Sequence, residues 1–245
     1  MSRVYLVRHG QAGTRKAYDA LSDLGRRQAR LLGEYFVSER IHFTAAYRGE
    51  LKRQEQTAEE VRLAYRDAEA CFPDVAPHSG WNEFDLDHIY RAPAPRMCAE
   101  DPEFQKEYRE MAAQARAAEL KHDAIVNRRW MPCDRKVVLA WIEGRYPYDG
   151  ESWPAFRERV ADCRGTLEHA GIRHDDANVV IFTSATPIAI WAALAMEIHD
   201  ERAMRLAGVL HNASCTVLKL VGEELRLHSF NGVPHLASPE LRTWR

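Results

Sequence analysis

The sequence predicts an α/β fold, a three-layer α/β/α sandwich with a mostly parallel central sheet. Two apolar runs, residues 4–7 and 179–183, have the unbroken hydrophobic character of strands buried on both faces. Stretches with helical periodicity alternate with these and other short strands, as in folds built from strand–helix units. The chain has 245 residues, 46% of them hydrophobic and 29% charged, which is enough for a sizeable core.

The first part of the chain contains two strand–helix pairs. The first strand runs into Gly10, which predicts a tight turn, and a polar, irregular stretch follows over residues 11–20. Ser22 is the expected N-cap of the first helix. A short strand over residues 43–47 precedes a second helix over residues 51–65. In this second helix the Gln and Glu side chains are expected on the solvated face, with Ala58, Val61 and Leu63 to Ala64 turned inward.

Residues 85–150 differ in composition from the rest and are predicted to form a helical insertion in a single domain that spans residues 1–245. The segment contains a Pro-rich run at 92–95, an alanine- and charge-rich stretch from Pro102 to about Val126, and Arg128-Arg129-Trp130. A lid or substrate wall and a set of surface helices without function are both compatible with it. For Arg128 and Arg129 a solvated face is favoured over substrate contact.

The second half of the chain repeats the alternation of helix and strand. Pro154 is tolerated in the first turn of a helix that Ser152 would cap. The expected elements are a helix from Ser152 to about Ala170 that stops at Gly171, the strand 179–183, the apolar helix Ile188 to Met196, and strands around 214–220 and 225–230.

Composition also indicates which partners to exclude. A net charge of −2 gives no general attraction to nucleic acid or to an anionic membrane surface. No apolar run approaches the roughly 20 residues of a membrane span, and no signal peptide is expected before a strand that starts at Val4. Five scattered cysteines without a C-x-x-C motif argue against a disulfide framework or a zinc site. The sequence therefore favours a cytoplasmic protein and leaves its oligomeric state open, a homodimer included.

Arg8 and His9 follow the first strand directly. This position is the C-terminal edge of the sheet, where open α/β folds bind their ligands. A guanidinium offers a planar fork of donors to phosphate oxygens, and a neutral imidazole can attack phosphorus to form a covalent intermediate. The pair therefore suggests phosphate chemistry.

Further motifs accompany this pair along most of the chain. These motifs are Leu6-Val7-Arg8-His9-Gly10-Gln11, Leu21-Ser22-x-x-Gly25-x-x-Gln28-Ala29, Leu51-x-Arg53-x-x-x-Thr57-Ala58, Trp81-Asn82-Glu83-Phe84, Gly150-Glu151-Ser152 with Arg159-Val160, Asn212-Ala213-Ser214, and Val233-Pro234-His235-Leu236. Together they resemble the histidine phosphatase superfamily, also called phosphoglycerate mutase-like, and the insertion lies outside the resemblance.

The resemblance implies a role for each matched residue. His9 would be the nucleophile, and Arg8 and Arg53 would hold the phosphoryl oxygens, where charge spreads in the transition state. Glu83 would protonate the leaving group and then activate water. Gln11, in the N-terminal signature, is expected to contact substrate.

Each of these assignments has competitors. Asp85 and Asp87 compete with Glu83 for the acid role, although Glu83 is favoured. Arg53 could instead be a solvated helix residue, but its motif favours the site. For His211 and His235 a structural hydrogen bond is favoured.

The sequence departs from the family at one catalytic position. The family normally carries a second histidine after its central strand, and Ser184 stands there in this chain. A hydroxyl can donate one hydrogen bond to a phosphoryl oxygen but brings no positive charge. Amides at the N-terminus of the following helix, with Pro187 in its first turn and Ser184 or Thr186 as cap, could favour an anion in compensation. Serine hydrolase chemistry is not favoured, because the turn lacks a G-x-S-x-G elbow.

Three functions are compatible with these residues. The leading hypothesis is a phosphohydrolase that acts through His9 on a small phosphorylated molecule, with no metal and no cofactor. The second is a protein that binds or responds to a phosphorylated ligand or inorganic phosphate, with catalysis impaired because of Ser184. A mutase is the third and least favoured, because it must shield a phosphohistidine from water without the second histidine.

Overall fold

The structure is a computed structural model that describes residues 2–13, 19–120, 132–169, 177–222 and 224–244. The Arg128-Arg129-Trp130 run and Gly171 lie outside these residues, as does part of the stretch 11–20. The chain divides into two compact units, one formed by residues 1–83 with 159–245 and the other by residues 84–158.

A six-stranded sheet forms the centre of the first unit, with the strand order β3-β2-β4-β1-β5-β6. The four strands from β3 to β1 pair in parallel, β5 is antiparallel to β1, and β6 is antiparallel to β5. The predicted α/β class with a mostly parallel sheet is therefore confirmed. The strands are β1 (Ser2–Arg8), β2 (Ala45–Arg48), β3 (Val75–Pro77), β4 (Asn178–Thr183), β5 (Cys215–Val221) and β6 (Glu224–Gly232).

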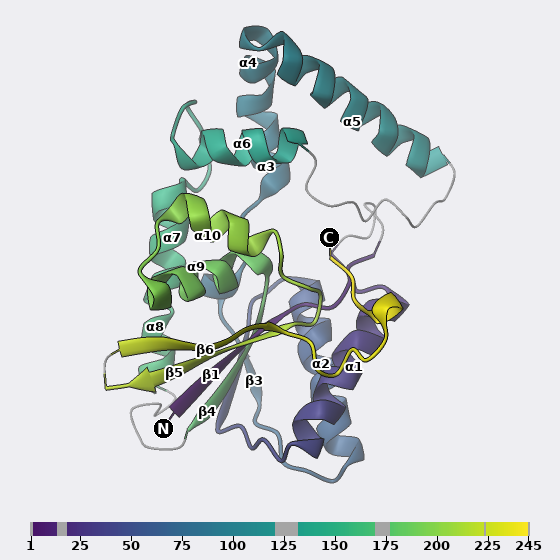
Figure 1. Ribbon diagram of the computed structural model, residues 1–245, viewed down its shortest axis with the longest axis vertical. Coiled ribbons are helices and arrows are strands. Elements are labelled where there is room, and N and C mark those ends of the chain that lie inside the picture. Colours follow the sequence, from purple (N-terminus) through teal and green to yellow (C-terminus); the bar gives the residue numbers. More distant parts are fainter. Residues whose placement is uncertain (1, 14–18, 121–131, 170–176, 223, 245) are drawn as a thin grey trace. The chain divides into compact units, whose positions relative to one another are not determined.

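Helices cover both faces of this sheet (Figure 1). Alternate side chains of β1 and β4, such as Val7 and Phe182, face the helices α1 and α2. They pack with Phe36 of α1 and Val61 of α2 in one apolar core. The other face packs against α9, which contacts β1, β5 and β6. The helices of this unit are α1 (Asp23–Ser38), α2 (Lys52–Asp67), α8 (Arg164–His169), α9 (Ala185–Met196) and α10 (Asp200–Ala207), with short 3₁₀ turns at η2 (Ser79–Trp81) and η4 (Pro239–Leu241).

Local sequence signals account for most of these elements. Ser22 caps α1 as predicted, since its Oγ accepts the N–H of Gly25 at 3.0 Å. The short strand β3 and the helix α10 were not expected, and they span only three and eight residues. The sequence also predicts Gln side chains on the solvated face of α2, which is wrong for Gln54, a completely buried residue.

The helix expected from Ser152 to about Ala170 is in fact two helices. α7 (Trp153–Asp162) and α8 are separated at Cys163. The carbonyl of Cys163 accepts the N–H of Thr166 at 3.1 Å and also the Thr166 hydroxyl. Such a side-chain bond competes with the regular helical hydrogen bond and ends the first helix there.

The second unit is helical. Its helices α3, α4, α5 and α6 pack on one another, and an aromatic group formed by Phe84, Trp141, Trp153 and Phe156 has ring centroids 4.9–5.9 Å apart. The bounds are α3 (Leu86–Arg91), α4 (Pro93–Glu100), α5 (Pro102–Leu120) and α6 (Pro132–Ile142).

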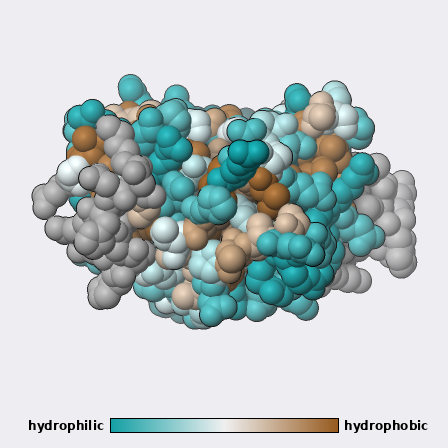
Figure 2. Space-filling model, turned by 90° about the horizontal axis from the view of Figure 1, so that it is seen from below, coloured by the Kyte–Doolittle hydropathy of each residue, from teal (hydrophilic) through white to brown (hydrophobic). Residues whose placement is uncertain are grey.

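The visible surface is mainly hydrophilic. Figure 2 shows one face on which hydrophobic residues lie in small groups among hydrophilic ones. Among the described helices, none combines the length and the apolar character that a membrane crossing requires.

Candidate active site

The carboxyl end of β1 brings Arg8 and His9 to the centre of the sheet edge. His9 N–H donates to the carbonyl of Thr183 at the end of β4, at 2.9 Å. The Arg8 N–H donates to Ser214 O at 3.0 Å, and its guanidinium Nη1 donates to the carbonyl of Leu210. Both side chains are buried. The predicted strand and turn therefore hold a guanidinium and an imidazole in fixed positions.

The hydrogen bonds of His9 define which ring nitrogen carries the proton. Nδ1 lies 2.8 Å from the carbonyl oxygen of Gly10. A carbonyl can only accept, so Nδ1 is the protonated nitrogen and Nε2 keeps its lone pair. The Nε–H of Arg53 points at Nε2 from 3.3 Å. The imidazole therefore presents an unprotonated nitrogen beside a guanidinium.

The first turn of α2 supplies Arg53, which is buried. Thr57, one turn further, donates to Arg53 O at 2.7 Å and accepts the N–H of Gly10 at 3.0 Å, which ties α2 to the turn after β1. The Nη1 of Arg53 also forms an ion pair with the carboxylate of Asp19, 3.1 Å away. An anion that enters the site would share Arg53 with this carboxylate.

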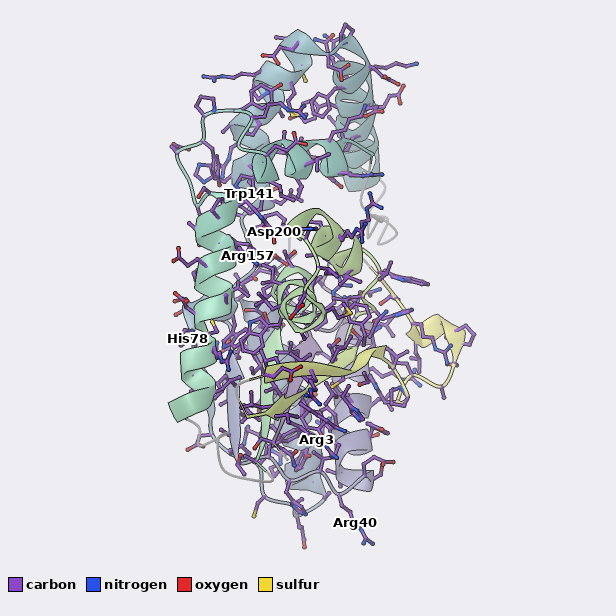
Figure 3. The ribbon with its side chains drawn as sticks, turned by 60° about the vertical axis from the view of Figure 1, so that its left-hand side comes forward. Arg3, Arg40, His78, Trp141, Arg157 and Asp200 are labelled. Carbon is purple, nitrogen blue, oxygen red and sulfur yellow. The ribbon has the colours of Figure 1, made fainter. Side chains whose placement is uncertain are left out.

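A well-anchored segment, residues 78–82, carries Glu83. Trp81 is fully buried against Trp191, with ring centroids 5.2 Å apart, and Figure 3 shows His78 beside the helices α7 and α8. Arg159 of α7 donates to the carbonyls of Ser79 and Gly80, both at 2.9 Å. This anchoring explains why a short loop can hold a carboxylate in place.

Glu83 accepts a hydrogen bond at the start of α9. Its Oε2 lies 3.1 Å from the backbone nitrogen of Thr186, one of the amides expected to face an anion. Of its competitors, Asp85 caps α3 by accepting the N–H of His88 at 2.9 Å, and Asp87 is exposed. Both competitors belong to the helical unit, whereas Glu83 belongs to the unit of His9.

Ser184 directly follows β4 and is almost completely buried. Ser184 occupies the N-cap position of α9, but its side chain accepts no hydrogen bond from a backbone N–H of that helix. Its Oγ accepts a hydrogen bond from Gln54 Nε2 at 2.9 Å. Sequence reasoning missed Gln54, although its place directly after Arg53 in the motif could have directed attention to it.

Two of the remaining candidates, Gln11 and His211, have structural hydrogen-bond partners. Gln11 Oε1 accepts from the Ser22 hydroxyl at 2.8 Å, so this amide supports the start of α1. His211 lies 3.3 Å from Asn231 Oδ1 and stacks near Trp244. Within the described ranges, no group of three or more His, Cys, Asp or Glu side chains is arranged to hold a metal ion.

Comparison with known proteins assigns the chain to a family. The sequence matches the histidine phosphatase superfamily (branch 1) over residues 4–140 and 132–232, and the chain belongs to that superfamily. A search of curated protein sequences found no match.

Solved structures share the fold. YhfR of Bacillus stearothermophilus has a TM-score of 0.62 at 17% identity, with 96% of this chain and 100% of that chain covered. A mycobacterial glucosyl-3-phosphoglycerate phosphatase with inorganic phosphate has a TM-score of 0.60 at 19% identity, covering 96% and 99%. A phosphoglycerate mutase from Bacillus anthracis has a TM-score of 0.60 at 15% identity, covering 96% and 95%.

Proposed function

We propose that this protein is a phosphohydrolase that cleaves a small phosphomonoester through a phosphohistidine at His9. The observation that carries the proposal is the imidazole itself: Nδ1 is held by Gly10 O at 2.8 Å, and Nε2 lies 3.3 Å from Arg53 Nε. An oriented, neutral imidazole beside a fixed cation is what attack on a phosphoryl dianion requires.

The reaction proceeds in two displacements. The lone pair of His9 Nε2 attacks phosphorus, the bond from phosphorus to the ester oxygen breaks, and Glu83 gives a proton to the departing oxygen. Water then attacks the phosphohistidine, Glu83 takes a proton from it, and the bond from nitrogen to phosphorus breaks to release inorganic phosphate. Arg8 and Arg53 hold the phosphoryl oxygens throughout, and none of these steps calls for a metal or an organic cofactor.

Two further points support the proposal. Structures of the same fold include a phosphatase with inorganic phosphate and a phosphoserine phosphatase variant from Entamoeba histolytica with phosphoserine. We infer a cytoplasmic protein because all five cysteines are free thiols. Its partners would be small phosphorylated molecules and not nucleic acid or membranes.

The first test uses His9→Ala. With an aryl phosphate as substrate, the wild type should turn over and form a phosphoenzyme that is labile in acid. His9→Ala should lose the phosphoenzyme and reduce kcat by at least about 10⁴-fold, because the nucleophile is gone. His228→Ala, which changes an exposed histidine of β6, is the matched control and should retain wild-type kcat. A wild type inactive on a broad panel of phosphoesters would contradict the proposal.

Ser184 favours a second candidate function, a phosphate-responsive binding protein with slow catalysis. A serine supplies no positive charge where the family carries a histidine. This function predicts saturable binding of inorganic phosphate with negligible turnover, and fast turnover by the wild type would eliminate it.

A further inference from the structure

The buried side-chain amide of Gln54 donates a hydrogen bond to Ser184. Gln54 is completely buried, and all its polar groups have partners: Nε2 donates to Trp81 O at 3.1 Å and to Ser184 Oγ at 2.9 Å, while Oε1 accepts the N–H of Leu51 at 3.2 Å. The fold makes room for this side chain at Gly49, where an added Cβ would lie 2.0 Å from Gln54 Oε1.

The backbone partners determine the orientation of the amide. Trp81 O can only accept and Leu51 N–H can only donate, so Nε2 faces Trp81 and Oε1 faces Leu51. The second hydrogen of Nε2 is then directed at Ser184. The serine oxygen must accept this bond, because an N–H cannot receive one. The hydroxyl hydrogen of Ser184 is therefore directed away from Gln54.

Strand register places Ser184 beside His9. β1 and β4 pair in parallel with Arg8 opposite Thr183, so the next residues of the two strands follow in register. Consecutive residues of α2 contact this pair: Arg53 lies 3.3 Å from His9 Nε2, and Gln54 lies 2.9 Å from Ser184 Oγ. The serine hydroxyl thus lies on the same side of the sheet as the imidazole.

We propose that Gln54 is a positioning residue that holds the Ser184 hydroxyl as a hydrogen-bond donor to the phosphoryl group transferred to His9. This inference rests on the proposed phosphohydrolase function. The Gln54–Ser184 pair supplies a neutral donor at the position where the family's second histidine would stand. Because neither residue titrates near neutral pH, this donor is present at every pH at which the protein is folded.

A double-mutant cycle tests the pair. Ser184→Ala should lower kcat on an aryl phosphate by about 10²-fold, with a smaller effect on KM, because the donor acts on the transition state. Gln54→Met should lower kcat by about tenfold, because the hydroxyl is no longer held in one orientation. In the Ser184→Ala background, Gln54→Met should change kcat by less than about twofold.

Two further variants guard against a purely structural effect. Gln56→Met removes an amide on the same helix that accepts the N–H of Leu21 at 2.8 Å, and it should keep wild-type kcat. Gln54→Glu offers Ser184 an acceptor in place of a donor, which reverses the hydroxyl and should reduce kcat to the level of Ser184→Ala. A folded Gln54→Glu protein with wild-type kcat would overturn the inference.

The outcomes separate this inference from the proposed function. If the wild type is active but the two losses multiply, the positioning role of Gln54 is refuted. If Ser184→Ala is harmless, the donor role of Ser184 is refuted as well. Neither outcome refutes the proposed phosphohydrolase function. If the wild type binds inorganic phosphate without turnover, the same cycle is measured as the dissociation constant for phosphate by calorimetry, with the same non-additivity expected. A wild type that neither hydrolyses phosphoesters nor binds phosphate overturns both.

Discussion

His235 shows how burial changes the chemistry of one residue. Its imidazole lies in the C-terminal segment, 9% exposed, with its centroid 6.3 Å from that of Tyr35. Burial lowers the pKa of His235 to about 4, because a charged ring would lose its solvation there. The ring is therefore neutral at pH 7, and it acts as a packed side chain.

The lowered pKa predicts sensitivity to acid. Between the pKa of about 6.5 that His235 has in the unfolded chain and its lower folded value, the unfolded chain binds the proton more tightly. The contribution of His235 to the free energy of unfolding is therefore fully present above pH 6.5 and is lost as the pH falls toward 4. The loss from this group amounts to about 3 kcal/mol. In urea unfolding at pH 7 and 4.5, His235→Leu should lose less stability on acidification than the wild type, whereas His228→Leu should behave as the wild type does. Equal losses in all three proteins would refute the role of His235.

At the scale of elements, the site depends on the close approach of the turn after β1 to the start of α1. A Cβ on Gly10 would lie 2.3 Å from Gly25 O, and a Cβ on Gly25 would lie 2.1 Å from Gln11 O. Both partners are backbone atoms, which cannot rotate away. The two glycines therefore let α1 contact the segment that carries His9.

Gly25→Ala should accordingly lower both the stability of the protein and its catalytic activity. We expect a loss of about 2 kcal/mol or more in the free energy of urea unfolding, because backbone must shift to admit the methyl group. The turnover number should fall as well, since the turn holds His9. Gly165→Ala in α8 is the control: an added Cβ has no neighbour within 4 Å there, and stability should be unchanged or slightly higher. Equal stability of the two variants would contradict the close approach.

Across the whole molecule, the five cysteines differ in how deeply they are buried, and they occur in both units. Cys71 is exposed and Cys98 half-buried, whereas Cys133, Cys163 and Cys215 are buried. Burial raises the pKa of Cys163 and of Cys215 to about 12, which leaves almost no reactive thiolate at neutral pH.

Titration of the native protein with an aromatic disulfide reagent should therefore occur in stages. Cys71 should react first and Cys98 more slowly, while the other three thiols should react only after unfolding in denaturant. Cys71→Ser should remove the fast phase and leave the rest unchanged. Rapid reaction of Cys215 in the folded protein, identified by peptide mapping, would contradict the burial described here.

Local patterns were sufficient to predict much of the fold. Unbroken apolar runs identify β1 and β4, because central parallel strands must be hydrophobic on both faces. Ser22 marks a helix start because its side chain accepts a backbone N–H of the first turn, and Gly10 marks a turn because glycine interrupts the apolar run of the strand. The family motifs around His9 and Arg53 likewise lie in short continuous segments, which can be recognised from the amino-acid sequence alone.

Only the tertiary structure decided how the site residues meet. The side of α2 that carries Gln54 is buried because Trp81 and Ser184, 27 and 130 residues away in sequence, pack over it. The partner of Glu83 is an amide 103 residues later. The sequence by itself determined which residues are expected to carry phosphate chemistry, and the fold determined their orientation, because hydrogen-bond partners distant in sequence leave no periodic signal in the chain.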